Sequence, residues 1–257
     1  MRLSIVIPNY NNAKWIGKCL ESIRNQTFTD YEIIVVDDMS IDNSVEEAKK
    51  YLREQDTLLV NESKRYNGGT RNVGILKAKG DYIFCIDSDD WLYNNTVLED
   101  INKALEGQDI LFLSNISHTE GYDLMTNINF KSIGDAMLSM TCAIWTKVIK
   151  RELLLKCLFQ EGTLFEDREH NYRLLMQKPT FTNLGKVAIV WNRTNTNTIS
   201  QNHTEEWNTY RFNYCGDLYR LIKDMEDYEI DGINLKSYIK EELKGYLQQC
   251  NKLVDEL

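Results

Sequence analysis

The chain has 257 residues, of which 42% are hydrophobic and 27% charged, values typical of a soluble globular protein. Its formal net charge of -9 argues against non-specific nucleic-acid binding through a basic surface, so we expect no nucleic-acid partner. No apolar run approaches the ~20 residues of a transmembrane helix, and the N-terminus lacks a signal-peptide cleavage site. The six cysteines are scattered without a C-x-x-C pair, which indicates reduced thiols in a cytoplasmic protein.

The first 60 residues alternate short apolar runs with helical patterns. Runs rich in Ile, Val and Leu predict strands at 3–7, 32–36 and 58–60. Between them, apolar residues recur at helical spacing from Ile16 to Ile23, and Asn43 to Glu46 resembles a capping box that begins a second helix reaching Leu52. The order β-α-β-α-β predicts a parallel sheet covered by helices.

Two adjacent glycines, Gly68 and Gly69, follow the third predicted strand, and we expect them to precede a helix. Glycines at such a place let backbone N–H groups approach a ligand, and a helix N-terminus favours phosphate. Arg71 adds a fixed, planar cation. A Gly-Gly pair is also common in ordinary turns. The chain has no G-x-G-x-x-G after its first strand and no G-x-x-x-x-G-K-S/T, which disfavours dinucleotide-binding and P-loop proteins.

The stretch with the most chemical information is D-Y-I-F-C-I-D-S-D-D-W at 81–91. A buried strand is predicted at 82–86, and the carboxylates of Asp87, Asp89 and Asp90 follow it at once. Because carboxylates this close repel one another, a hard divalent cation that also clamps a phosphate would suit them. Open α/β sheets bind ligands at the carboxyl ends of their strands, where these residues fall. The alternative is a solvated acidic turn.

The next part of the chain is less regular. A helix is predicted at 98–105 and strands at 110–113 and 187–191, whereas loops and a short edge hairpin are expected between 114 and 139. Residues 143–155 mix apolar and basic side chains, and neither a helix nor a strand is predicted there. The acidic pair Glu166-Asp167 leads into a helix that continues to Met176, and the polar segment 194–203 is expected to be a mobile loop.

From Glu205 onward the chain is predicted to be helical, with a break near 231–232. The last helix carries an apolar stripe of Leu235, Ile239, Leu243, Leu247 and Cys250. Such a stripe could lie on a membrane surface, on a partner or on the core of this chain. Residues 205–257 carry 7 Lys+Arg against 12 Asp+Glu, a net charge of -5, which disfavours anionic lipid. We therefore favour packing within the chain or in a homodimer.

Six motifs, in this order along the chain, are similar to those of the family 2 glycosyltransferases. They are S-I-V-I-P-N-Y-N at 4–11, V-V-D-D-M-S-I-D-N-S at 35–44, G-G-T-R-N-V-G at 68–74, D-S-D-D-W at 87–91, W-T-K-V-I-K-R-E-L-L at 145–154 and F-E-D-R-E at 165–169. The resemblance covers about residues 1–198. Met39 stands where a glycine is usual, Gly69-Thr70 where Ala or Ser is common, and His170 where an aromatic residue usually closes the E-D-x-x motif.

The resemblance implies an α/β fold of the nucleotide-diphospho-sugar transferase (GT-A) type, with a mixed, mostly parallel sheet flanked by helices and a C-terminal helical extension. The glycosyltransferase domain would span 1–204, with a nucleotide-sugar-binding half at 1–113 and an acceptor-binding half at 114–204. The helical extension would span 205–257.

The resemblance also implies which residues bind the nucleotide. Pro8, Tyr10 and Asp38 would line the base pocket, with Asp38 accepting a hydrogen bond from a uracil N–H. Arg71 would lie near the base or the diphosphate, and Gly69 would belong to the same nucleotide-sugar site.

Further roles are implied for the acidic motifs. Asp87 would hold the ribose side of the nucleotide and, with Asp89, would bind the Mn²⁺ or Mg²⁺ ion that bridges the two phosphates. Ser88 and Asp90 would contact the nucleotide-sugar. Asp167 would be the catalytic base. The alternative for Glu166 and Asp167 is that two acids merely begin a helix, where the helix dipole favours them.

The implied activity is metal-dependent transfer, with inversion, of a hexose or N-acetylhexosamine from a UDP-sugar to a hydroxyl of a glycan or lipid-linked glycan. The implied context is bacterial capsule, exopolysaccharide or lipopolysaccharide synthesis in the cytoplasm, and association with the inner face of the membrane stays open. One alternative is a non-catalytic nucleotide-sugar-binding partner subunit, against which Asp89 and Asp167 argue. Another alternative, suggested by the D-x-D of Asp87 and Asp89, is a haloacid-dehalogenase-type phosphatase. That class would need its D-x-D at the first strand, whereas here the motif follows a later strand. His118, His170 and His203 are too dispersed for a zinc site and are expected at the surface, and the alternative for His203 is a place near the metal ion.

Overall fold

The computed structural model describes residues 2–139, 143–163, 166–196 and 205–255, with side chains in the last range described from 215 to 248. The main sheet consists of β1 (Leu3–Asn9), β2 (Tyr31–Asp37), β3 (Thr57–Val60), β4 (Tyr82–Cys85), β5 (Trp91–Leu92), β6 (Ile110–His118), β7 (Asp123–Thr126), β8 (Lys147–Lys150) and β9 (Phe181–Asn192). The strand order is β3-β2-β1-β4-β8-β6-β9-β5, and β7 pairs with β6.

The first four strands form the parallel half of this sheet. Leu3 of β1 pairs with Tyr31 of β2 on one side and with Tyr82 of β4 on the other, and all residues of these three strands are buried. Uninterrupted apolar runs suit strands that are covered on both faces. Because the strands are parallel, the segments that follow β1, β2 and β4 emerge at one edge of the sheet, as the sequence predicted.

The other half of the sheet is mixed. The strand β8 lies antiparallel between β4 and β6, in a segment to which the sequence pattern assigned no element. The strand β6 continues to His118 and forms the expected edge hairpin with β7, while β9 begins at Phe181, earlier than predicted. These extensions carry polar residues such as Ser114 and Asn115, so they lack the apolar run that identifies a buried strand.

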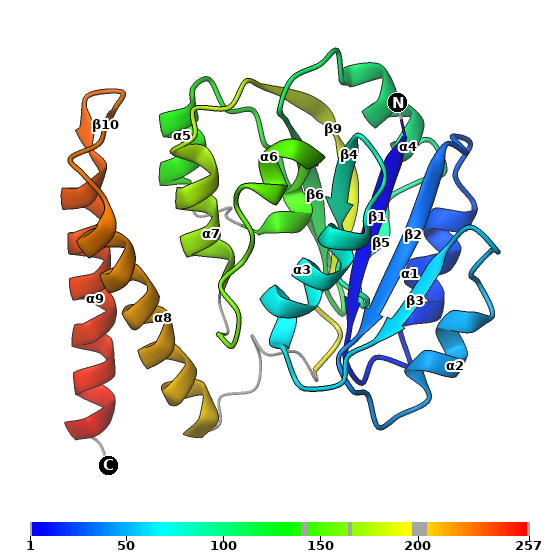
Figure 1. Cartoon of the computed structure of the whole chain (residues 1–257), viewed down its shortest axis with the longest axis horizontal. Coiled ribbons are helices and arrows are strands. Elements are labelled where there is room, and N and C mark those ends of the chain that lie inside the picture. The colour runs from blue at the N-terminus through cyan, green and yellow to red at the C-terminus, as the bar shows by residue number, and fades with distance from the viewer. Residues whose placement is uncertain (1, 140–142, 164–165, 197–204, 256–257) are drawn as a thin grey trace.

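Helices cover both faces of the sheet (Figure 1). They are α1 (Ile16–Arg24), α2 (Ser44–Lys49), α3 (Tyr66–Lys77), α4 (Val97–Ala104), α5 (Ile133–Leu138), α6 (Arg151–Leu155) and α7 (Glu166–Leu175), with a 3-10 turn at Ile144–Thr146. Alternate residues of β1 divide between two cores: Ile5 packs with α1, α2 and α4, whereas Val6 packs with α3, α5, α6 and α7. Each fully buried aliphatic side chain contributes about 1.5–3 kcal/mol relative to an exposed one.

Two of these helices differ from the predictions. The capping box expected at the start of α2 is wrong, because the side chain of Asn43 makes no capping hydrogen bond, and the helix ends before Leu52. The helix α5 was not predicted, although its start carries a recognisable signal: the side chain of Ser132 accepts a hydrogen bond from the backbone N–H of Asp135.

The C-terminal part consists of α8 (Glu205–Asp224), a hairpin of β10 (Glu229–Ile230) and β11 (Ile233–Asn234), and α9 (Leu235–Asp255). The two helices lie side by side at the flank of the α/β part, outside α5 and α7 (Figure 1). The predicted break at 231–232 is confirmed as the turn of the hairpin.

The apolar stripe of α9 packs mainly inside the molecule. Leu235 and Ile239 are fully buried in the same core as Tyr172 of α7, and Leu243 is 8% exposed, whereas Leu247 is 41% exposed. The side chain of Cys250 and residues 197–203 of the expected mobile loop lie outside the described residues. Within the parts of the chain that the structure describes, none of the helices has the length and apolar character needed to cross a membrane.

Candidate active site

The polar segments that follow β1, β2 and β4 meet at one edge of the sheet. The backbone N–H of Asp38 donates to the carbonyl of Asn9 at 2.8 Å, and that of Ile86 donates to the carbonyl of Val6 at 3.0 Å, so adjacent strand ends stay paired up to the turns. The D-S-D-D turn then closes with a hydrogen bond from the backbone N–H of Asp90 to the carbonyl of Asp87, at 3.0 Å. These backbone hydrogen bonds therefore hold the acidic motif in a defined position at the edge of the sheet.

The centre of the site is the buried guanidinium of Arg71, which is 1% exposed. Its Nη2 lies 2.7 Å from Oδ1 of Asp87, and its Nη1 contacts Glu166 and lies 3.6 Å from Oδ1 of Asp167. Burial alone would lower the pKa of Arg71, but the three carboxylates raise it well above its ordinary value. One arginine of α3 thus joins the D-S-D-D turn to the acidic pair of α7. The sequence predicted Arg71 near the base or the diphosphate and gave no sign of this link.

The two acids of the E-D pair have different environments. Glu166 is 5% exposed, and burial raises its pKa to about 7 although the nearby Arg71 lowers it. The side chain of Asp167 is 24% exposed, and its Oδ1 accepts no hydrogen bond from the residues that the structure describes. Burial also raises the pKa of Asp167, and Arg71 opposes this shift. Glu166 is committed to Arg71, so Asp167 is the better placed of the two to accept a proton.

The other carboxylates of the turn are held by asparagines. Asp89 accepts a hydrogen bond from Nδ2 of Asn195 at 2.7 Å, and buried Asp90 accepts one from the backbone N–H of Asn192 at 2.8 Å. Burial and the neighbouring aspartates raise the pKa of Asp89 to about 6 and that of Asp90 well above its ordinary range. Sequence reasoning missed both asparagines, although polar residues just after the apolar run of β9 were a usable signal.

Ser88, which stands between Asp87 and Asp89, is nearly fully buried, and its side chain faces the segment that follows β1. Its Oγ accepts a hydrogen bond from Nδ2 of Asn12 at 2.9 Å, and Oδ1 of Asn12 lies 3.3 Å from Nδ2 of Asn195. Asn12 therefore links Ser88 to the residue that holds Asp89. The contact of Ser88 with a nucleotide-sugar stays a prediction.

The carboxylates of the turn have the chemistry that Mg²⁺ and Mn²⁺ prefer, because all the donors are hard oxygens. Among the described residues, no three His, Cys, Asp or Glu side chains have the arrangement of a complete metal site. Oδ2 of Asp90 is buried without a hydrogen-bond partner in this part of the chain. Because the described side chains do not complete a metal site, Asp87 and Asp89 would fit an ion that takes its remaining ligands from phosphates and water, as Mg²⁺ usually does.

Asp38, the predicted uracil acceptor, also holds the start of α3. Its Oδ1 accepts hydrogen bonds from Nδ2 of Asn61 at 2.8 Å and from the backbone N–H of Arg65 at 2.9 Å. Its Oδ2 accepts from the backbone N–H of Tyr66 at 2.9 Å and lies 3.3 Å from Nζ of Lys64. A uracil N–H would have to replace one of these donors, and the binding role of Asp38 stays a prediction.

Pro8 and Tyr10, the other predicted base-pocket residues, lie at the carboxyl end of β1. Pro8 is buried inside the strand, opposite Val36 of β2. Tyr10 is 45% exposed, and the ammonium group of Lys64 lies over its ring. The roles of Tyr10 and Pro8 in binding the base stay predictions.

The expectation that the glycine pair precedes a helix is wrong, because Gly68 and Gly69 lie in the first turns of α3. A Cβ at Gly68 would lie 2.8 Å from the carbonyl oxygen of Gln160, and one at Gly69 would lie 2.9 Å from Cβ of Arg65. A Cβ at Gly74 would lie 2.5 Å from Cγ1 of Val6 in β1. Gly68 and Gly74 therefore let α3 pack closely against the loop of Gln160 and against β1, and Arg71 lies between them on the same helix. Contact of Gly69 with a nucleotide-sugar stays a prediction.

Comparisons with known proteins identify the family of the chain. A family model described as Glycosyl transferase family 2 matches residues 4–164. Glycosyltransferase GlyG of Streptococcus pneumoniae serotype 4 is 31% identical over 205 residues, which cover 70% of this chain and 68% of that protein. Poly(ribitol-phosphate) beta-glucosyltransferase of Bacillus spizizenii is 39% identical over 126 residues, which cover 47% of this chain and only 20% of that protein.

Two solved structures show the same fold. Staphylococcus aureus TarS 1-349 in complex with UDP-GlcNAc has a TM-score of 0.72 at 21% identity, covering 96% of this chain and 72% of that chain. The mannosyltransferase PcManGT of Pyrobaculum calidifontis, in complex with GDP-Man and Mn²⁺, has a TM-score of 0.67 at 15% identity, covering 94% and 69%. The expected GT-A fold is confirmed. Because the family model matches most of the chain, the chain belongs to glycosyl transferase family 2.

Proposed function

We propose that this protein transfers a sugar from a UDP-sugar to a hydroxyl of a bacterial surface glycan, with a divalent metal ion and with inversion at the anomeric carbon. The observation that carries the proposal is the buried guanidinium of Arg71, which brings Asp87 and the E-D pair into one site. The donor class is supported by the fold shared with a UDP-GlcNAc complex, and the acceptor class by a relative named for poly(ribitol phosphate).

On the donor side, Asp87 and Asp89 would hold the metal ion, which when bound offsets the negative charge that grows on the leaving diphosphate. The ion pair between Arg71 and Asp87 fixes the carboxylate at the turn. Asn195 orients Asp89 through its hydrogen bond. Tyr10 and Asp38 would bind the base at the neighbouring strand ends.

On the acceptor side, Asp167 would act as the general base. An acceptor hydroxyl has a pKa far above neutral, so it must lose its proton as its oxygen attacks the anomeric carbon. The proton moves to the Asp167 carboxylate, the new glycosidic bond forms on one face of the sugar, and the bond to the diphosphate breaks on the other. The configuration therefore inverts. Arg71 helps to keep Asp167 ionised despite its burial, and Glu166 holds Arg71.

The test is Asp167→Asn, assayed for sugar transfer from a panel of UDP-sugars that includes UDP-GlcNAc to poly(ribitol phosphate) and other surface glycans. Because the amide keeps the shape but accepts no proton, transfer should fall by roughly 10²–10⁴-fold. UDP affinity should stay within a few-fold of wild type, and EDTA should suppress transfer by the wild-type protein. NMR of the product should show the inverted configuration.

Near-normal transfer by Asp167→Asn would refute the assignment and direct attention to Glu166. Binding of UDP-sugars with neither hydrolysis nor transfer would instead favour a non-catalytic nucleotide-sugar-binding subunit.

The proposed function also places the activity in the cytoplasm. A lipid-linked acceptor would be presented at the inner face of the membrane.

A further inference from the structure

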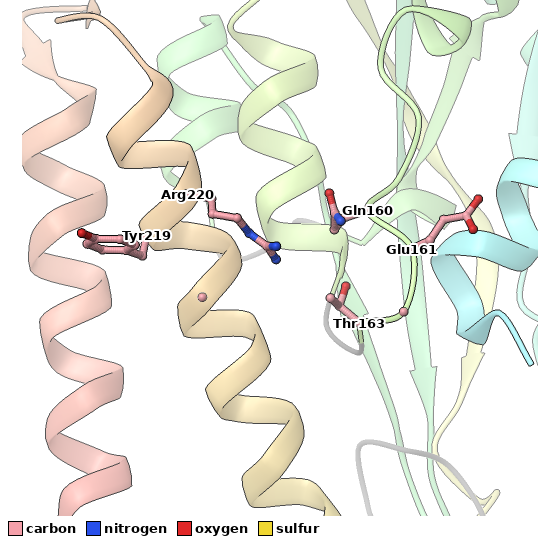
Figure 2. A pocket seen from close by; sticks show the side chains of 7 residues that line it. Gln160, Glu161, Thr163, Tyr219 and Arg220 are labelled. Atoms are coloured by element: carbon pink, nitrogen blue, oxygen red, sulfur yellow. The ribbon is translucent and has the colours of Figure 1, made fainter.

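An open pocket with a volume of about 550 Å³ lies between the loop before α7 and the C-terminal helix α8 (Figure 2). This volume is in the range of small-molecule sites, ~300–1,000 Å³. The pocket is lined by Gln160, Glu161, Gly162, Thr163, Gly216, Tyr219 and Arg220. Figure 2 shows Gln160 and Thr163 on the loop and Arg220 on the facing side of α8. The family motifs account for none of these residues.

The pocket adjoins the acidic pair. The carbonyl oxygen of Gln160 and Cγ of Glu166 lie 2.8 Å and 3.1 Å from the point where a Cβ would stand on Gly68, so they are close neighbours. The lining loop also leads directly in sequence to Glu166 and Asp167. A ligand in this pocket would therefore lie near the start of α7, the helix that carries the proposed base.

The loop wall of the pocket is held in place by α3. The side chain of Asn72 donates to the carbonyl of Phe159 and accepts from its backbone N–H, both at 2.9 Å. Glu161 forms an ion pair with Arg65 at 3.0 Å. These contacts hold residues 159 and 161 against α3, which would reduce the ordering needed on binding.

The polar groups of the pocket suit hydroxyl groups. Thr163 is 6% exposed, and its Oγ1 has no hydrogen-bond partner among the described residues. Gln160 adds an exposed amide, which can donate and accept. Arg220 pairs with Asp217 within α8, and its side chain is 60% exposed. A ligand rich in hydroxyls can both donate to and accept from such a set, which an aliphatic chain cannot.

We propose that this pocket binds the carbohydrate of the acceptor, beyond the unit whose hydroxyl reacts. The proposal rests on the proposed function and assigns the C-terminal helices a part in substrate recognition. The loop of residues 160–163 would contact the acceptor from one side and α8 from the other.

Gly216 offers a direct way to fill the pocket. Among the described residues, a Cβ at this position has no neighbour within 4 Å, and almost any residue favours a helix more than glycine does, so Gly216→Trp should fold. Gly245 of α9 likewise has no described neighbour within 4 Å and does not line the pocket, so Gly245→Trp is the matched control.

Both tryptophan variants and the wild type are compared in two measurements. Saturation-transfer difference NMR in the presence of UDP and diamagnetic Mg²⁺ monitors binding of poly(ribitol phosphate), β-glucan oligosaccharides and N-acetylhexosamine oligosaccharides. Hydrolysis of UDP-GlcNAc and other UDP-sugars monitors the donor site. We expect Gly216→Trp to weaken carbohydrate binding at least tenfold while donor hydrolysis stays within twofold, and Gly245→Trp to resemble the wild type.

The proposal is overturned if no carbohydrate of the panel binds in a way that Gly216→Trp removes, or if both tryptophan variants weaken binding equally. A wild-type protein that neither hydrolyses UDP-sugars nor transfers sugar, yet binds carbohydrate in a manner that Gly216→Trp abolishes, would refute the proposed function and leave the pocket assigned. The two failures are therefore distinguishable.

Discussion

Met39 and His170 depart from the family pattern, and the structure gives a physical reason for each position. Met39 has a φ of 66°, in the left-handed region that favours glycine, and its side chain points outward with 44% exposure. His170 stacks on Phe159 with ring centroids 3.9 Å apart, so the imidazole supplies the flat surface of the usual aromatic residue. Its expected surface position is wrong, since it is 1% exposed.

The burial of His170 predicts a loss of stability in acid. Burial lowers its pKa from 6.5 to about 3, and Arg173, Lys147 and Arg71 add to this shift, while the hydrogen bond to the Cys157 carbonyl opposes it. Below pH 6.5 the unfolded chain binds a proton that the folded chain excludes, so stability falls as the pH decreases. Between pH 7.5 and pH 5 this one residue should cost about 2 kcal/mol.

His170→Phe keeps the stacking on Phe159 and removes the titration. Urea denaturation at pH 7.5 and pH 5 should therefore show a smaller acid loss in the variant, by about 2 kcal/mol. The lost hydrogen bond to Cys157 lowers its stability at both pH values alike. An equal acid loss in the two proteins would contradict the prediction.

At the scale of elements, the sequence predicted those whose pattern is local. The strands β1, β2 and β4 are uninterrupted apolar runs, and α1, α7 and α9 show helical spacing, so each was recognised. The strand β8 was not, because K-V-I-K becomes a strand only through pairing with β4 and β6, and its Lys147 is buried. Tertiary pairing decides such a segment, and local propensity does not.

The candidate site shows the same difference between features with a local sequence pattern and features that depend on tertiary contacts. Motif spacing identified the acidic turn and the E-D pair, whereas the ion pairs of Arg71 join positions up to 96 residues apart and leave no local signal. The packing role of Gly68 against Gln160 is equally non-local. Sequence reasoning therefore named Arg71 and the acids as site residues, but not the ion pairs that join them.

The link between α3 and α7 can be tested with Arg71→Met. The substitution leaves Glu166 buried without its cation, and Asp87 and Asp167 lose the same partner, so the free energy of unfolding should fall by about 3–5 kcal/mol. Adding Glu166→Leu removes the most deeply buried of these charges and should restore part of the loss. Thermal and urea denaturation of the single and double variants measure the coupling. If the losses of stability caused by the two substitutions simply add in the double variant, the ion pair between Arg71 and Glu166 does not link α3 to α7.

For the whole molecule, the C-terminal helices share a core with the α/β part. Ile239 of α9 and Leu218 of α8 are fully buried in the cluster that contains Leu174 and Tyr172 of α7. The division between 1–204 and 205–257 stays a prediction, but this shared core favours one cooperative unit. The sequence showed the apolar stripe of α9, and only the fold showed what covers it.

Substitutions along that stripe provide the test. Ile239→Ala opens a cavity in the shared core and should lower stability by about 2–5 kcal/mol. Leu247→Ala, at a position that is 41% exposed, should change it by no more than ~0.5 kcal/mol. Calorimetry of the whole chain should show a single transition that Ile239→Ala shifts downward. Two transitions, of which only one shifts, would establish an independent C-terminal domain.

The Arg71–Glu166 pair also constrains how related chains can diverge. Replacing Glu166 leaves Arg71 with Asp87 and Asp167, whereas replacing Arg71 leaves three carboxylates without their cation, so the two positions are not equivalent. Position 71 should therefore be retained more strictly than position 166 among homologues. Position 167 is more accessible than position 166 and, as the proposed base, should be retained for its chemistry.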